Sequence, residues 1–223
     1  FAAASRQEVH GAPLSFPALQ SILCKKNSMA IPPETGNVVL EAVRCFIRAN
    51  LKPVRYAHSF RVAETAVRLC AKYGIAPENA PLAGTAHDMC KDMDDETLTT
   101  LALRDGMPLT PLETQNPALL HGRGAAVKLR EGFGVSASEV LEAVRLHTFG
   151  KAGMCPLAQI IYVADKIEPG RTQVTTGYLS ALEPLTLPQL LRFVTGENLA
   201  FLEKQGKRVA PESQELYQWT VSR

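Results

Sequence analysis

The stretch "PVRYAHSFRVAETAVRLCAKYG", residues 53–74, decides the expected fold. Val62, Ala66 and Leu69 recur at intervals of three and four residues, a spacing that places them on one face of a helix. Gly74 follows the last periodic residue, where glycine commonly ends a helix. The pattern therefore predicts a long amphipathic helix that buries this face.

The same spacing continues on both sides of this stretch. Upstream, "NVVLEAVRCFIRAN" (37–50) carries an apolar stripe, and Asn37 is expected to cap its first turn. Downstream, "QIIYVAD" (159–165) has the β-branched content of a strand, but the helical period around it favours a buried helix. We therefore expect an all-α fold. Further helices are expected over residues 77–87, 94–105, 110–119, 122–131, 136–147, 156–168, 187–204 and 211–220.

Residues 1–36 differ from the rest of the chain. They are rich in Pro, Ser and Gly and show only short apolar patches. Because the chain starts at Phe1, this segment is expected to be an N-terminal extension, either the tail of a preceding domain or the remnant of a trimmed chain. Residues 37–223 are expected to form one helical domain, a size that can bury a substantial core.

The composition excludes several classes of partner. A formal net charge of +2 without a long basic run gives no electrostatic case for binding a nucleic acid polymer. No apolar run has the length of a membrane span. Five cysteines without a CxxC pair argue against a disulfide framework, so a reducing cytoplasm is the expected location. The many apolar residues on the helices leave a homodimer open.

The stretch "LAGTAHDMCKDM", residues 82–93, raises the first question of chemistry. An apolar run of small residues ends in His87 and Asp88, which suits either a metal site or a charged turn at the end of a buried helix. Neighbouring residues on a helix point about 100° apart, so both can face one ion only where the helix ends. Ala83 and Gly84 are expected to let this helix approach its neighbours closely.

Four histidines and two aspartates of the helical domain could share such a site. Asp88 and Asp165 each end an apolar run, and a buried carboxylate without a partner costs several kcal/mol or takes up a proton. Imidazoles and carboxylates satisfy one another best around a divalent cation, and this ligand chemistry suits iron, manganese, cobalt, nickel or zinc. The candidate metal ligands are His58, His87, Asp88, His121, His147 and Asp165.

These residues stand in motifs that resemble a known family. The motifs are "RYAHSFRVAETA", "AGTAHDMCKDM", "LLHGRGAA", "EAVRLHTFGKAGMCPLAQIIYVADKIEPGR" and "KQGKRVAPES", which together cover roughly residues 50–215. They resemble the HD-domain metal-dependent phosphohydrolases, and among them the YqeK-type symmetrical bis(5′-nucleosyl)-tetraphosphatases. The resemblance implies an HD-domain helical bundle with a metal site between its helices.

The resemblance also implies an activity. It implies a hydrolase that cuts diadenosine tetraphosphate, or another dinucleoside polyphosphate, symmetrically into two ADP or GDP-like products at a dinuclear centre of iron. By the same resemblance, His58, His87, Asp88 and Asp165 hold the first ion, and His121 and His147 hold the second with Asp88 as the bridge. The implied substrate-binding residues are His58, His121, His147, Thr148, Asp165, Arg171 and Arg208.

Two basic residues are candidates for a catalytic role beside Asp88. A polyphosphate carries several negative charges, so Lys91 is expected to stabilise charge on the transferred phosphate, and Arg171 to clamp the phosphates of the leaving nucleotide. The competing interpretations are an ion pair of Lys91 with Asp94 or Asp95, and one of Arg171 with Glu168. Gly122 and Gly124 are weaker candidates for a turn that approaches phosphate.

Two alternatives remain at this point. Another member of the HD family could use the same ligands on a nucleoside triphosphate, a guanosine alarmone or a cyclic nucleotide. A non-catalytic helical regulatory module is the second alternative. Six intact candidate ligands favour an enzyme, because buried ionisable groups concentrate where they have a chemical task.

Overall fold

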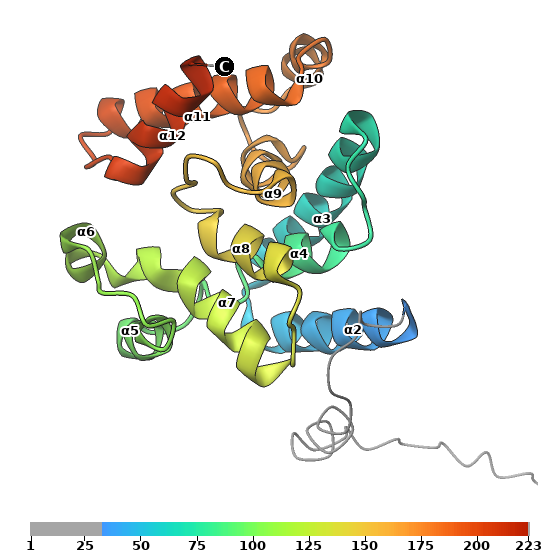
Figure 1. Ribbon diagram of the computed structural model, residues 1–223, viewed down its shortest axis with the longest axis vertical. Helices are drawn as coiled ribbons and strands as arrows, with labels where there is room; N and C mark the ends of the chain where they lie inside the picture. The colour runs from blue at the N-terminus through green and yellow to red at the C-terminus, as the bar shows by residue number, and fades with distance from the viewer. Residues whose placement is uncertain (1–32, 223) are drawn as a thin grey trace, which may run out of the picture. The chain divides into compact units, whose positions relative to one another are not determined.

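The computed structural model describes residues 33–222, and all the regular elements of that range are helical. This confirms the all-α prediction. Most of the proposed N-terminal extension, residues 1–32, lies outside the described residues. The helices in Figure 1 are α2 (Pro33–Asn50), α3 (Pro53–Tyr73), α4 (Ala80–Ala86), α5 (Asp95–Leu103), α6 (Pro111–Gln115), the 3-10 helix η1 (Pro117–Leu120), α7 (His121–Gly132), α8 (Ser138–Leu146), α9 (Pro156–Ile167), α10 (Thr176–Leu182), α11 (Leu187–Lys204) and α12 (Pro211–Val221).

Helix α9 lies at the centre of the described domain. Its "IIYV" run, residues 160–163, is completely buried, which confirms that the β-branched segment is a helix enclosed on all sides. Helices α3, α4, α8 and α11 pack around it. Each large apolar side chain buried in this way stabilises the fold by roughly 1.5–3 kcal/mol.

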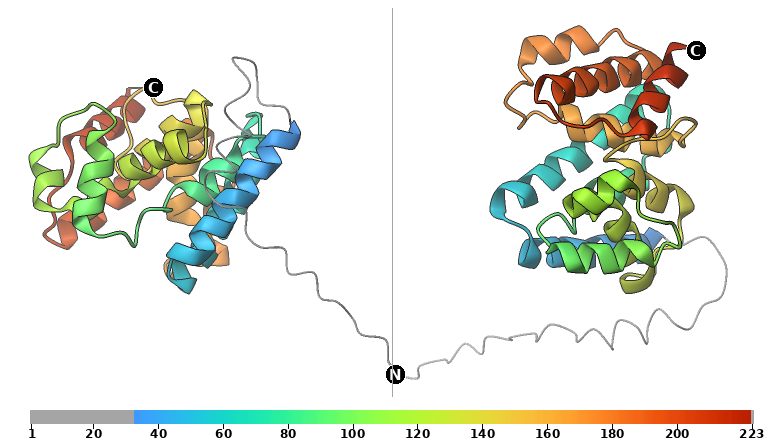
Figure 2. Two further views of the ribbon diagram at one scale, coloured as in Figure 1. Left: turned by 90° about the horizontal axis from the view of Figure 1, so that it is seen from below. Right: turned by 90° about the vertical axis from the view of Figure 1, so that its left-hand side faces the viewer.

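The two ends of the domain have different neighbours. In the views of Figures 1 and 2, α10, α11 and α12 lie at one end, and α2 and α5 lie at the other. Helices α3, α4, α8 and α9 occupy the space between them. None of the described helices is long and apolar enough to cross a membrane.

A glycine lets α4 lie directly against α3. A Cβ atom added to Gly84 would stand 2.5 Å from the Cα atom of Ala63, well inside van der Waals contact. The buried side of α3 is lined by Val62, Ala66 and Leu69, as its spacing predicts, and Gly74 ends that helix with a φ of 65°. The small residues before His87 therefore do what the sequence indicates, and they bring the end of α4 next to α3.

Three local predictions are wrong. Helix α2 begins at Pro33, so Asn37 lies inside it and is not its N-cap. The helix expected over 110–119 is divided into α6 and η1, because Pro117 has no N–H with which to continue the first helix. Gly122 lies inside α7 and makes no phosphate turn; a Cβ there would lie 3.1 Å from the carbonyl oxygens of Val144 and Arg145 in α8.

Helix α10 was not predicted. Its seven residues span only two turns, too few for an apolar period to stand out. Thr175 caps it by accepting a hydrogen bond from the backbone N–H of Tyr178.

Candidate metal centre

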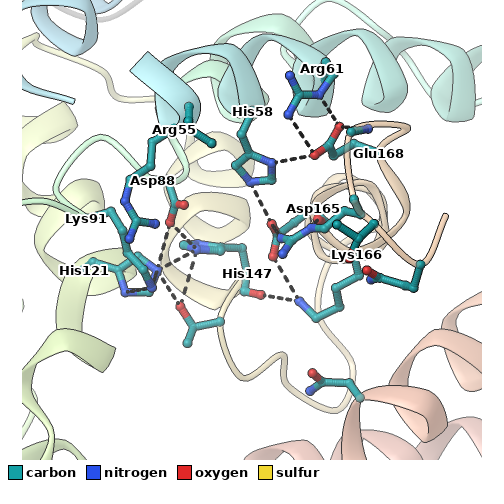
Figure 3. A pocket seen from close by; sticks show the side chains of 17 residues that line it. Arg55, His58, Arg61, Asp88, Lys91, His121, His147, Asp165, Lys166 and Glu168 are labelled. Atoms are coloured by element: carbon teal, nitrogen blue, oxygen red, sulfur yellow. Dashed lines mark hydrogen bonds and ion pairs between the residues drawn. The ribbon is translucent and has the colours of Figure 1, made fainter. Parts of the chain in front are cut away.

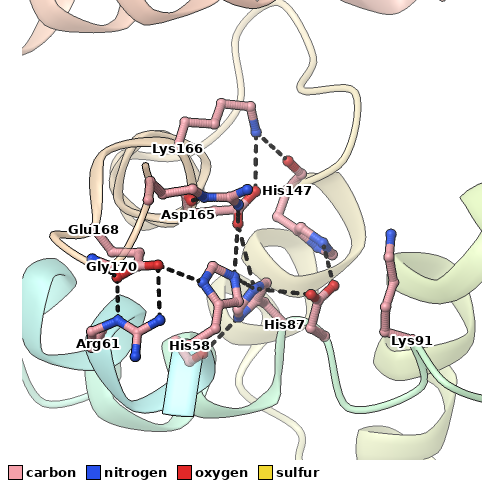
Figure 4. Close-up of polar contacts among 12 residues, drawn as sticks. His58, Arg61, His87, Lys91, His147, Asp165, Lys166, Glu168 and Gly170 are labelled. Carbon is pink, nitrogen blue, oxygen red and sulfur yellow. Dashed lines mark hydrogen bonds and ion pairs between the residues drawn. The ribbon is translucent and has the colours of Figure 1, made fainter. Parts of the chain in front are cut away.

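Six side chains from five parts of the fold converge between α3, α7, α8 and α9. His87 and Asp88 follow α4 directly, and His147 follows α8 directly. His87 and Asp88 thus lie at a helix end, as their adjacency predicts, and His147 occupies the corresponding position after α8. The other members of the group are His58 in α3, His121 at the first residue of α7, and Asp165 in the last turn of α9. Figure 3 shows five of the six side chains, and Figure 4 shows the sixth, His87, beside His58, His147 and Asp165.

Three of the four imidazoles are oriented by the main chain. In each of them Nδ1 lies 2.7 Å from the carbonyl oxygen of the residue three positions earlier, so Nδ1 carries the proton and donates it. The unprotonated Nε2 atoms then point into the centre. This arrangement is typical of histidines that bind a metal, whose second nitrogen is held by a carbonyl or a carboxylate. The three pairs are His87 with Gly84, His121 with Ala118, and His147 with Val144.

The fourth imidazole, His58, is oriented by a side chain. Its Nδ1 lies 3.0 Å from Oε1 of Glu168, a buried carboxylate. Glu168 also accepts hydrogen bonds from the guanidinium of Arg61 and, at 2.6 Å, from the backbone N–H of Gly170. Sequence reasoning considered Glu168 only as a partner of Arg171. The signal that could have identified it is its place directly after the apolar run of α9.

Hydrogen-bond acceptor atoms lie close together in the centre. Nε2 of His58 lies 3.2 Å from Nε2 of His87, and Nε2 of His121 lies 3.0 Å from Nε2 of His147. Oδ1 of Asp88 is 3.1 Å from His121 Nε2 and 3.5 Å from His147 Nε2. Because His121 and His147 carry their protons on Nδ1, the lone pairs of their Nε2 atoms face one another and repel unless a cation stands between them.

These residues therefore fit a divalent metal centre. Two groups of three ligand atoms lie close enough to share an ion. Each consists only of imidazole nitrogen and carboxylate oxygen, which bind first-row divalent metals. Asp88 belongs to both groups, which are His58, His87 and Asp88, and Asp88, His121 and His147.

Electrostatics keep most of these groups in the form that binds metal. Burial lowers the pKa of His87 to about 4, and burial also lowers the pKa of His121, so both rings are neutral at neutral pH. Burial acts in the opposite sense on Asp88, but the imidazoles of His87 and His121 hold the pKa of this carboxyl well below its usual range. Neutral imidazoles beside an ionised carboxylate are the protonation states that a metal requires.

His58 and Asp165 form the second electrostatic unit. Burial opposes ionisation of Asp165, but the charge of Lys166, a hydrogen bond with His58 and the charge of Arg171 keep its pKa well below the usual range. Burial alone would lower the pKa of His58, yet the carboxylates of Asp165 and Glu168 raise it. A proton on Nε2 of His58 takes the place that a metal would occupy, so binding a metal here releases that proton.

A cavity of about 540 Å³ opens over the centre. Its volume lies in the range of small-molecule pockets. The acidic residues that line it are Asp88, Asp165 and Glu168, and the basic residues are Arg55, Arg61, Lys91, Lys166 and Arg171. Even before a metal is added, the basic groups outnumber the acidic ones, which suits a substrate with several negative charges.

The two predicted basic residues both reach this cavity. Nζ of Lys91 lies 3.2 Å from both ring nitrogens of His121, and within residues 33–222 it forms no ion pair with Asp94 or Asp95. Arg171 donates to the carbonyl oxygen of Asp165 at 2.8 Å and to the Asp165 carboxylate. The Arg171 side chain therefore pairs with Asp165 and not with Glu168.

Of three further polar residues, two line the cavity and one lies outside it. The hydroxyl of Thr148, a predicted substrate contact, lies 3.3 Å from Nε2 of His121 and lines the cavity. Sequence reasoning missed Lys166, whose ammonium donates to the carbonyl oxygen of His147 at 3.0 Å and to the carboxylate of Asp165 at 3.3 Å. Arg208 does not lie in this cavity; it donates to the side chain of Gln115 at 3.0 Å.

Comparisons with known proteins agree with this arrangement. The profile of the HD domain family matches residues 55–170, which include all six candidate ligands. Two proteins named symmetrical bis(5′-nucleosyl)-tetraphosphatase are similar to the chain. The one from Bacillus subtilis is 33% identical over 182 residues, covering 82% of this chain and 97% of that protein. The one from Staphylococcus aureus is 35% identical over 133 residues, covering 60% and 68%.

A solved structure is also similar. It is a crystal structure from Clostridium acetobutylicum, described as a predicted HD superfamily hydrolase involved in NAD metabolism. It superposes with a TM-score of 0.76 at 30% identity, over 82% of this chain and 97% of that one. The chain therefore belongs to the HD domain family, in the branch whose members are named symmetrical bis(5′-nucleosyl)-tetraphosphatases.

Proposed function

We propose that this protein is a metal-dependent hydrolase that cleaves diadenosine tetraphosphate symmetrically into two molecules of ADP. The observation that carries the proposal is the convergence of four imidazoles and two carboxylates beneath a cavity with a basic lining. The relatives named symmetrical bis(5′-nucleosyl)-tetraphosphatase supply the substrate class. Since adenine and guanine derivatives present the same phosphates, GDP-like products are expected from guanine substrates.

The centre is proposed to hold two ions of iron. His121 and His147 would bind one ion, and Asp88 would bridge it to the other. Bound divalent ions supply an acidified water and a Lewis acid for phosphoryl oxygens. Manganese, cobalt, nickel or zinc would suit the same nitrogen and oxygen ligands. The remaining ligands of the other ion would be His58, His87 and Asp165.

The chain's own basic groups would bind and orient the polyphosphate. Lys91 stands over His121 and forms no ion pair with a carboxylate among the described residues, so its charge is available to the transferred phosphate. Arg171 keeps part of its planar guanidinium free while it pairs with Asp165, a geometry suited to the phosphates of the leaving nucleotide. His58, His121, His147, Thr148 and Asp165 border the same space and would contact the substrate there.

Product analysis tests this proposal directly. The protein is reconstituted anaerobically with ferrous iron and incubated with diadenosine tetraphosphate, and the nucleotides are separated by chromatography. ADP as the sole product supports symmetrical cleavage, whereas AMP together with ATP contradicts it. Absence of turnover at full metal occupancy rejects the activity and favours another nucleotide or a regulatory role.

The division of ligands has its own test. His121→Ala should reduce the content of one ion more than that of the other, because His121 belongs to only one group of candidate ligands. Metal analysis after dialysis measures this. Equal loss of both ions would contradict the proposed division.

The remaining assignments stay predictions. Binding of Arg208 to the nucleotide would require it to leave Gln115, and Arg208→Ala kinetics test this. A homodimer is tested by light scattering, and a cytoplasmic location by cell fractionation.

A further inference from the structure

A second cavity lies beside the metal centre. Its volume is also about 540 Å³, and helices α10 and α11 line its far side. The two cavities are adjacent, because five residues line both of them. These are Lys166, Arg171, Thr172, Gln173 and Asn198. We call this second cavity the α10–α11 pocket.

The α10–α11 pocket offers the chemistry that a nucleoside needs. Phe201 and Tyr178 provide aromatic surface, and Phe201 is 55% exposed although it is a large apolar side chain. Glu197 and Asn198 add polar groups, and the hydroxyl of Tyr178 donates to the Glu197 carboxylate at 2.5 Å. An aromatic wall beside a few fixed polar groups is typical of a pocket for a flat heterocycle and a sugar.

The basic residues stand where the two cavities meet. Lys166 and Arg171 line both of them, and both are bound to Asp165. A ligand with its phosphates at the metal centre would pass these two cations before it reaches Phe201. From the metal centre outward, a ligand would therefore meet first the metal ligands, then the two basic side chains and then the ring of Phe201. This sequence matches the order of reacting phosphate, outer phosphate and nucleoside in half of a dinucleotide.

A competing cavity fits less well. It has a volume of about 270 Å³ and shares only Thr148 with the pocket over the metal centre. The α10–α11 pocket is about twice as large and shares five residues with the centre, two of them basic.

We propose that the α10–α11 pocket binds one of the two nucleosides of the dinucleotide substrate. Its base would stack on Phe201, and its ribose hydroxyls would bind to Glu197 and Asn198. This inference rests on the proposed function and adds a binding site to it. It assigns a role to α10, the helix that sequence analysis missed.

The test compares substrate affinity with phosphate affinity in Phe201→Ala, using the metal-loaded full chain. The variant should raise KM for diadenosine tetraphosphate by at least about fivefold, through the loss of one base–aromatic contact. The inhibition constant of inorganic phosphate, which has no nucleoside, should stay unchanged. Phe201→Tyr keeps the ring and should restore KM. Leu103→Ala removes a similarly exposed apolar side chain on α5, 49% against 55%, and serves as the control, in which KM should stay unchanged.

Each outcome has one meaning. A wild-type KM in Phe201→Ala would overturn the inference while leaving the activity in place. A parallel change in phosphate inhibition would also overturn it, because the effect would then come from the metal centre. If the wild-type protein does not hydrolyse the substrate, the proposed function fails, and the inference fails with it.

Discussion

Two buried polar clusters in this domain show opposite balances of donors and acceptors. In the first, the guanidinium of Arg123 donates to Asp105 at 2.7 and 2.8 Å and to Glu113 at 2.9 Å. Its remaining hydrogen bonds go to the backbone carbonyls of Met107 and Pro108. In the second, the metal centre, imidazole nitrogens face one another and face carboxylate oxygens.

The difference separates a structural cluster from a binding site. The Arg123 cluster supplies its own cation and fixes the segment between α5 and α7. In the metal centre, Lys91 approaches only His121, and no basic side chain of residues 33–222 pairs with both Nε2 atoms of His121 and His147. An excess of buried acceptors therefore marks the place where a metal is needed, whereas burial of charged residues alone does not.

The largest expected effect is that of Asp88→Asn. The change keeps the shape of the side chain but replaces one carboxylate oxygen of Asp88, the residue that belongs to both ligand groups, with an amide nitrogen. We expect hydrolysis to fall by at least about a thousandfold, since metal ions contribute several kcal/mol to such reactions. The measurements are the rate of hydrolysis and the metal content of the purified variant. The matched control is Asp105→Asn, the same change in the Arg123 cluster, which should keep both; retention of activity by Asp88→Asn would contradict the bridge.

The second effect concerns stability. Arg123→Met leaves the buried Glu113 and the half-buried Asp105 without their cation and should lower the free energy of unfolding by about 3–5 kcal/mol. Urea unfolding measures the change. Arg104→Met is the control, because its ion pair with Glu131 is exposed and should contribute less than about 1 kcal/mol. Similar losses in both variants would remove the contrast between buried and exposed pairs.

The third effect falls on metal affinity. Glu168→Gln replaces the carboxylate that contacts Nδ1 of His58 with a neutral amide. Loss of such a partner typically lowers the affinity for the metal by about 10–100-fold. Titration of the metal-free protein measures it. Glu131→Gln, on an exposed acid paired with Arg104 and Arg130, should leave the affinity unchanged. An unchanged affinity in Glu168→Gln would show that Glu168 does not orient His58.

The smallest effect is a pH dependence of stability. Burial opposes ionisation of Asp105, yet the hydrogen bond from Arg123 keeps the pKa of Asp105 below its ordinary value. A lowered pKa in the folded state stabilises the fold above the unfolded pKa of about 3.9, and this contribution is lost as the pH falls through the folded pKa. Asp105→Asn should therefore flatten the acid side of the stability curve. Parallel curves for variant and wild type below about pH 5 would contradict this.

Much of the fold follows from the sequence, because long helices repeat their apolar spacing several times. Helix α3 has the predicted bounds, and α9 ends within one residue of its prediction. Short elements carry fewer repeats, so α10 was missed and Pro117 was not recognised as a boundary. Asn37 shows a further limit, since a good capping residue also occurs inside a helix.

The centre was predictable in part. Residue identity and family resemblance indicated the six candidate ligands, and the structure brings all six together. Glu168 and Lys166 were missed because, in sequence, a charged residue near an arginine or an aspartate looks like a surface ion pair. Only the fold shows that Glu168 faces His58 and that Lys166 is anchored to His147.

The main-chain carbonyls that orient three of the histidines limit what mutation can change. Every amino acid supplies the same carbonyl oxygen, so a substitution at residue 118 or 144 leaves the acceptor in place. At Gly84 the carbonyl is equally independent of the side chain, but a Cβ would clash with Ala63 and displace α4. His58 alone depends on a side chain that the genetic code can replace. Among the four contacts that hold an Nδ1 atom, evolution of the metal preference can therefore replace the side chain of one, Glu168, whereas backbone carbonyls make the other three.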